Sequence, residues 1–189
     1  MEASERYNIL LKSLTDSGVV IEPKASKWYW KVLAGVLWVI SFGQIKFLDT
    51  STTTIGTIIG TPSTWHTYTD AEKYETLLHE QVHIAQYKRF GFGNAWVGII
   101  PVGFAYLFLP FPVGLAYCRA KLEQEGYEES IRAIMQLRGL NAVLQSKTFF
   151  ISQFTSANYL WMWPFASNVE KWFNAAVKRI AIEEGVFKK

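Results

Sequence analysis

The residues with the clearest chemical potential form the pentapeptide His79-Glu80-Gln81-Val82-His83. On an α-helix the two histidines lie one turn apart on the same face, so both imidazoles can bind one tetrahedral metal ion. Glu80 lies between them and flanks that ion, where a carboxylate can act as a general base. The pattern therefore predicts a metal-binding helix that carries its own proton acceptor.

This pentapeptide is specific although it is short. The chain holds 3 histidines and 13 glutamates in 189 residues, and a random shuffle of that composition gives about 0.003 expected matches. Two histidines on one helix face can also be plain core or surface residues, and that interpretation stays open on the pentapeptide alone.

A catalytic zinc ion takes three protein ligands and leaves its fourth position to water, so the pentapeptide needs a further ligand. The remaining histidine, His66, lies upstream in a predicted loop. Downstream, the acidic side chains gather in residues 119–129, on a long predicted helix. This cluster is the candidate source of the third ligand.

The elements around these residues are predicted from periodicity and end signals. Thr69 and Glu72 make a capping box before a helix over 70–90, and the β-branched run over 49–62 indicates strand. Other helices are expected over 3–16, 26–41, 113–138 and 141–153, and after a capping box at Ser167 and Glu170. The expected fold is α+β and mostly helical, with a short β-hairpin or edge strand before the active-site helix.

Three uncharged stretches, 32–45, 90–118 and 148–169, must be tested as membrane spans. The first is shorter than the roughly 20 residues that cross a bilayer. Pro101, Pro110 and Pro112 interrupt the second, and five polar side chains would be costly in lipid in the third. We expect one domain over 1–189, with a proline-interrupted apolar insertion at about 91–112.

Composition narrows the function classes. The net charge is only +3 and half of the residues are hydrophobic, which argues against nucleic acid as a partner. The single cysteine, Cys118, fits a reducing compartment. The first residues lack the basic start and apolar block of a signal peptide, so we expect a cytoplasmic or membrane-associated protein.

With these features the sequence resembles the gluzincin zinc metallopeptidases, in which a second helix gives a glutamate to the metal. In several branches, including the CAAX-prenyl-protease and ImmA/IrrE types, this glutamate stands in a Glu-x-x-Ala motif. The chain has Glu123-Gln124-Glu125-Gly126, with glycine in place of alanine. The resemblance implies a small zincin-like domain in which His79, His83 and Glu123 hold Zn²⁺ and Glu80 is catalytic.

Helix geometry separates the two glutamates of this motif. Ala116, Ala120 and Gly126 share the face of Glu123, where small residues let two metal-binding helices approach. Glu125 points about 200° away on a helical wheel. We therefore assign Glu123 to the metal and Glu125 to solvent or to a supporting contact.

The resemblance also suggests supporting residues. Arg119 could orient Glu123, and Glu75 could accept an imidazole N–H from His79. Tyr127 and Tyr159 are candidate oxyanion donors, although each also fits a structural aromatic. Gln86, one turn past His83, extends the motif to the His-Glu-x-x-His-x-x-Gln of uncharacterised bacterial and phage proteins.

In the same family a strand usually edges the cleft before the active-site helix, and residues 52–61 occupy that place. A substrate peptide could pair with such an edge by main-chain hydrogen bonds. Gly56 and Gly60 would leave room for its approach, and a bulged strand explains them equally.

The function expected from the sequence is a zinc-dependent endopeptidase that hydrolyses peptide or protein substrates with a metal-activated water. One alternative is a non-catalytic zinc-binding structural or assembly protein, for example of a virus particle. Glu80 argues against it, because a structural site has no need of a general base. Another is a membrane-attached protein with a vestigial zinc site, whose surface contact with lipid would run through residues 90–118.

Overall fold

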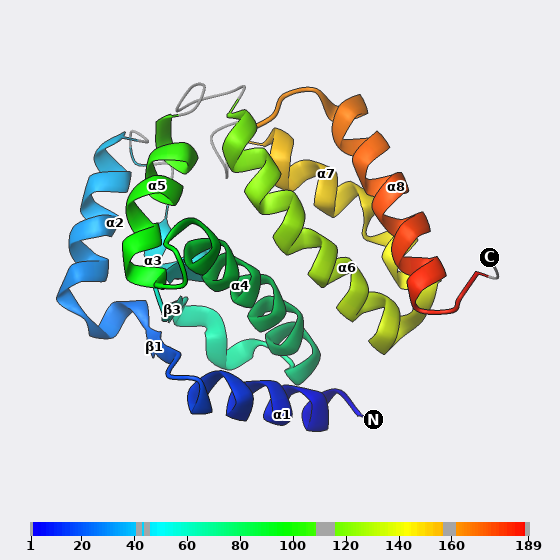
Figure 1. The fold of residues 1–189 in the computed structure, drawn as a ribbon, viewed down its shortest axis with the longest axis horizontal. Helices are drawn as coiled ribbons and strands as arrows, with labels where there is room; N and C mark the ends of the chain where they lie inside the picture. The colour runs from blue at the N-terminus through cyan, green and yellow to red at the C-terminus, as the bar shows by residue number, and fades with distance from the viewer. Residues whose placement is uncertain (1, 41–42, 44–45, 109–115, 157–161, 188–189) are drawn as a thin grey trace. The chain divides into compact units, whose positions relative to one another are not determined.

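The computed structural model describes residues 2–40, 43, 46–108, 116–156 and 162–187. The chain divides into two compact units, residues 1–102 and 103–189. Helices dominate both units, and the described strands form one small sheet (Figure 1). The predicted α+β, mostly helical fold class is therefore confirmed. The predicted single domain and its zincin-like character stay predictions.

The first unit contains the three-stranded sheet and the helices before and after it. Its elements are α1 (Ala3–Asp16), β1 (Val20–Pro23), η1 (Lys24–Ser26), α2 (Trp28–Ile40), α3 (Phe47–Thr50), β2 (Thr53–Ile55), β3 (Ile58–Thr61), η2 (Ser63–Thr67), α4 (Asp70–Phe90) and the start of α5 (Ala95–Phe108). The helices expected over 3–16, 26–41 and 70–90 are confirmed as α1, α2 and α4.

The sheet has the order β1-β3-β2. β2 and β3 form the antiparallel hairpin expected before α4, with Thr54 opposite Ile59. β1 pairs with β3 in parallel, with Ile21 also opposite Ile59. The sequence reasoning missed β1, because its four residues include a charged and a proline residue and show no alternation.

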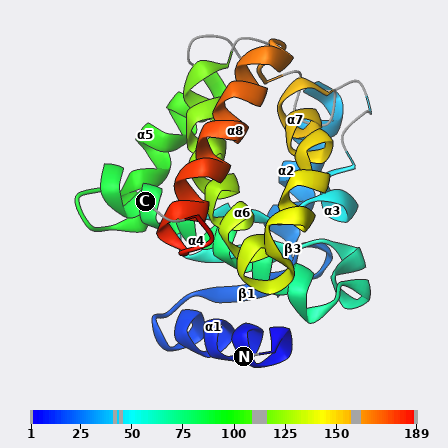
Figure 2. The ribbon, with the colours of Figure 1, turned by 90° about the vertical axis from the view of Figure 1, so that its right-hand side faces the viewer.

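The core of this unit joins α1, α4 and β3. Leu10 and Leu14 of α1 pack with Ile59 of β3 and with Leu77 and Ile84 of α4. Figure 2 shows α1 running below β1, on the far side from α2 and α5. The central strand and α1 thus fix α4, which carries the pentapeptide.

At two glycines of the hairpin, side chains of the same unit occupy the space that a Cβ atom would need. A Cβ at Gly60 would lie 2.7 Å from side-chain atoms of both Lys24 and Trp30. Gly56 has a positive φ of 61° in the turn of the hairpin, and its Cβ would lie 2.9 Å from the ring of Trp96. The expected room for a substrate backbone at these glycines is therefore wrong, because side chains of this chain occupy it.

The second unit is a helical bundle of α6 (Tyr117–Gln145), α7 (Lys147–Thr155) and α8 (Ala166–Glu183). Its core includes Ile131, Phe150, Phe154, Phe173 and Ile180. Arg132 of α6 ties the end of α8 through Glu183 at 2.6 Å and Glu184 at 2.7 Å. This network closes the bundle at its C-terminal end.

Two predicted boundaries in this unit differ from the structure. Helical structure is interrupted at Gly139 (φ 82°, ψ 174°), as expected, but resumes within α6 to Gln145, and α7 then starts at Lys147. The capping box at Ser167 is wrong, because α8 already begins at Ala166 and its N-cap is Phe165. The carboxylate of Glu170 instead pairs with Lys147 at 2.5 Å.

The apolar insertion forms a turn followed by α5, which is 14 residues long and contains Pro101. Its last expected part, residues 109–112, lies outside the described residues. Within the described part of the chain, no helix combines the length and apolarity that a bilayer crossing requires.

Candidate metal site

Helix α4, which carries the pentapeptide, begins with a capping box. The Thr69 backbone N–H donates to the Glu72 carboxylate (2.7 Å), and the Glu72 N–H donates to the Thr69 hydroxyl (3.3 Å), which completes the predicted capping box. The helix buries Leu77 and Ile84 together with three polar side chains, His79, Glu80 and Gln86. Burial of polar groups is costly without partners, so each of these three side chains needs a partner inside the protein.

The two histidines converge on one point. The Nε2 atom of His83 lies 3.1 Å from the Nε2 atom of His79. Two nitrogens that bind one tetrahedral ion at about 2.05 Å each lie about 3.3 Å apart. The observed separation therefore matches shared coordination of a single ion by both imidazoles.

Gln86 sets the orientation of His83. The Nδ1 atom of His83 lies 2.9 Å from Oε1 of Gln86, which is almost fully buried. A carbonyl oxygen only accepts, so Nδ1 carries the proton and Nε2 keeps its lone pair. Gln86 thereby holds His83 in the tautomer that a metal ligand needs.

Glu80 is buried and held by the hairpin. Its Oε2 accepts a hydrogen bond from the hydroxyl of Thr54 at 2.7 Å. The backbone carbonyl of Thr54 accepts a second hydrogen bond, from the hydroxyl of Tyr87, at 3.0 Å. Strand β2 and helix α4 are thus locked together at the residue that the sequence assigns as the base.

A buried lysine lies near this carboxylate. The Lys24 ammonium donates to the backbone carbonyls of Phe47 and Ser51 and lies 4.0 Å from the centre of the Phe47 ring. Burial lowers the pKa of Lys24 to about 8, and the negative charges of Glu80 and Asp49 partly oppose that shift. Lys24 therefore adds a positive charge to the interior beside Glu80.

Glu123 lies on α6 in the second unit and is 2% exposed. Arg119, one turn earlier, and the small residues Ala116, Ala120 and Gly126 are buried as well, while Glu125 is only half-buried. The face of α6 that carries Glu123 is therefore buried, as the predicted helix register requires.

The other candidates have different surroundings. The ring of Tyr127 packs at 5.5 Å from Phe150 and from Phe154, in the core of the bundle. His66 is exposed on η2, with Nδ1 2.9 Å from the Ser63 carbonyl oxygen. Glu75 is half-buried on α4, and its predicted bond to His79 stays a prediction. Tyr159 lies outside the described residues.

Sequence reasoning missed Thr54 and Lys24. Thr54 is one of four threonines between residues 50 and 54, and only the register of the hairpin shows which of them turns toward α4. Lys24 follows Pro23 in a segment that carried no predicted element. No signal in the sequence alone marks either residue.

Comparison of the chain with protein-family models, with curated proteins and with solved structures finds no match.

Proposed function

We propose that this protein is a zinc-dependent endopeptidase in which His79, His83 and Glu123 hold the metal and Glu80 is the general base. The observation that carries the proposal is the 3.1 Å approach of the two histidine Nε2 atoms beside a buried, hydrogen-bonded Glu80. A structural site needs the first feature but has no use for the second.

The donor set fits zinc. Two imidazole nitrogens and one carboxylate are the ligands of a catalytic zinc site with an open fourth position. His79, His83 and Glu123 form a group that could hold one metal ion. The near-complete burial of the Glu123 carboxylate also supports a ligand role, since buried charges pair with cations or coordinate metals.

Bound zinc would supply a water of lowered pKa and would polarise the scissile carbonyl. With the metal bound, Glu80 would take a proton from the attacking water and deliver it to the leaving amine. Thr54 holds Oε2 of Glu80, so the carboxylate is oriented before substrate arrives. Gln86 keeps Nε2 of His83 unprotonated for the metal.

The edge position of strand β2 suggests the class of substrate. β2 lies at one end of the strand order, and its Thr54 contacts the base. An extended peptide that pairs with a strand edge at this place would bring a main-chain amide to Glu80. Unfolded protein is therefore the substrate to offer.

The test is the Glu80→Gln variant, compared with Glu125→Gln as a matched control on a half-buried glutamate that is not assigned to the metal. Both purified proteins should contain one zinc per chain by elemental analysis, like the wild type. Cleavage of casein should fall by at least about 100-fold in Glu80→Gln, because the general base is lost. Glu125→Gln should cleave at the wild-type rate.

Equal cleavage by wild type and Glu80→Gln would contradict the proposal. Zinc binding without cleavage by the wild type would favour the non-catalytic zinc protein instead.

A further inference from the structure

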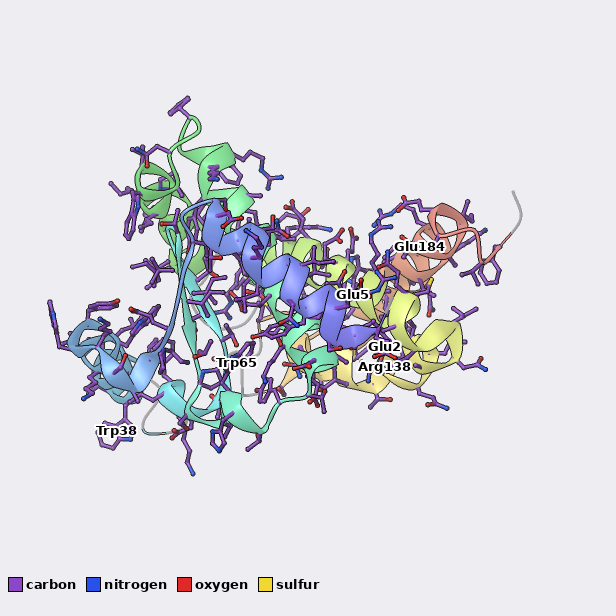
Figure 3. All side chains as sticks on the ribbon, turned by 90° about the horizontal axis from the view of Figure 1, so that it is seen from below. Glu2, Glu5, Trp38, Trp65, Arg138 and Glu184 are labelled. Atoms are coloured by element: carbon purple, nitrogen blue, oxygen red, sulfur yellow. The ribbon has the colours of Figure 1, made fainter. Side chains whose placement is uncertain are left out.

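Helix α2 carries an apolar stripe that is exposed within the described part of the chain. Trp28, Val32, Val36 and Val39 recur at helical spacing along one face, and all four side chains are exposed, Trp28 to 74%. Trp38 is also exposed, and Figure 3 labels it beside α2. The buried side of α2 is anchored instead by Trp30, whose indole N–H donates to Glu22 at 2.9 Å.

The start of α5 and the turn before it show the same property. Ala95, Gly98 and Val102 are buried, and a Cβ at Gly98 would lie 1.8 Å from the carbonyl oxygen of Tyr87. The opposite face is apolar and exposed: Trp96, Val97 and Ile100, with Phe90 at the end of α4 and Phe92 in the turn. We call these five residues and the five exposed residues of α2 the apolar surface.

Phe92 is the most unusual member of this surface. Its side chain is 100% exposed, and its φ of 52° lies in the left-handed region, where a bulky residue costs free energy. Glycine or asparagine would suit this turn better for folding. A strained, fully exposed phenyl ring is better explained by a ligand that buries it.

The segments that carry the apolar surface contain only positive charges, and one of them, Lys27, lies 3.9 Å from the buried Glu22 carboxylate. Residues 23–48 and 81–122 contain no aspartate or glutamate. The exposed side chains of Lys27, Lys31, Lys88 and Arg89 flank the apolar residues. Such a pattern of tryptophan, aliphatic and basic residues is typical of helices that lie in the interface of an anionic bilayer.

We propose that the first unit attaches peripherally to anionic phospholipid bilayers through the apolar surface, with Phe92 inserted below the headgroups. In Figures 1 and 2, α2 and the start of α5 lie on the same side of the sheet, opposite α1. At 13 residues α2 is too short to cross a bilayer, so it lies in the interface. A second copy of the chain is a poorer occupant, because it would bring the same cations.

The experiment is vesicle flotation of the full chain. One vesicle preparation contains phosphatidylcholine alone, and the other contains phosphatidylcholine mixed with phosphatidylglycerol. Wild type should float with the anionic vesicles, lose binding as salt is raised, and bind neutral vesicles weakly. Phe92→Asn should lower the partition coefficient by about tenfold, since a phenyl side chain no longer enters the bilayer.

Control variants test whether vesicle binding depends on the apolar surface and on the cations beside it. Phe149→Asn removes an exposed phenyl ring of α7 and should leave binding unchanged. Lys31→Glu with Arg89→Glu should abolish binding, whereas Lys171→Glu with Lys178→Glu on α8 should not. Asparagine tolerates the backbone of Phe92, so the melting temperature of Phe92→Asn should match or exceed that of wild type.

Three results would overturn the proposal. They are absence of wild-type binding to anionic vesicles, equal binding to neutral vesicles, and a self-association that Phe92→Asn abolishes without any vesicle binding. None of these results depends on zinc or on peptidase activity, so the test is separate from that of the proposed function.

Discussion

Gln86 contacts the Nδ1 side of the His83 imidazole, so its substitution tests the proposed metal site. Its Oε1 lies 2.9 Å from Nδ1 of His83, and loss of such a supporting contact typically costs 10–100-fold in metal affinity, which gives about 30-fold for Gln86→Leu. Competition with a chromophoric chelator at neutral pH measures this change. Gln81→Leu, an exposed position on the same helix, is the control and should keep wild-type affinity. Equal affinities of the two variants would show that Gln86 does not orient the histidine.

The lowered pKa of Lys24 predicts how the free energy of unfolding depends on pH. Its pKa is about 8 in the folded chain, below the ordinary value of 10.5. Between these values the unfolded chain binds a proton that the folded chain has released, so the free energy of unfolding rises with pH. The lysine's contribution is about 3 kcal/mol at most over that window.

The check is urea unfolding of wild type and Lys24→Met from pH 7 to pH 10.5. The wild type should gain stability relative to Lys24→Met as pH rises through 8, and tyrosine ionisation cancels in the comparison. Parallel curves for the two proteins would mean that Lys24 keeps an ordinary pKa in the folded state.

At the scale of elements, the register of α6 decides the third ligand. Glu123 is almost fully buried and Glu125 half-buried on the same helix. Glu123→Ala should lower zinc affinity by more than about 100-fold, because a protein ligand is lost, and Glu125→Ala should leave it unchanged. Zinc titration of both variants gives the answer, and loss of metal in Glu125→Ala alone would refute the register.

The elements that the sequence predicts well are those with strong local signals. The capping box at Thr69 and Glu72 placed α4 correctly, and the β-branched run placed the hairpin. β1 was missed because it is stabilised by its parallel pairing with β3, a contact between distant segments. The capping box at Ser167 failed because α8 already begins at Ala166, and the Glu170 carboxylate pairs with Lys147.

The site residues also divide into those that the local sequence predicts and those that only the tertiary structure brings to the site. The ligand and base pattern is readable because the spacing of His79, Glu80 and His83 on one helix needs no tertiary information. Helical spacing alone does not show which side of α4 packs inward, because the structure buries Leu77 and Ile84 and exposes Ala85. Thr54 and Lys24 enter the site only through sheet register and tertiary packing.

At the scale of the whole molecule, the proposed metal ligands come from two compact units of one chain. α4 of the first unit supplies His79 and His83, and α6 of the second unit supplies Glu123. Hydrolysis by the proposed site would use these three ligands together with Glu80.

The most direct measurement is casein digestion by the zinc-loaded protein in ¹⁸O-labelled water, followed by mass spectrometry of the peptides. The account predicts new C-termini that carry one ¹⁸O atom with the wild type, and none with Glu80→Gln or after zinc removal, because a metal-activated water attacks the peptide carbonyl. Intact casein in the wild-type digest, or labelled C-termini that persist in the Glu80→Gln digest, would contradict the account.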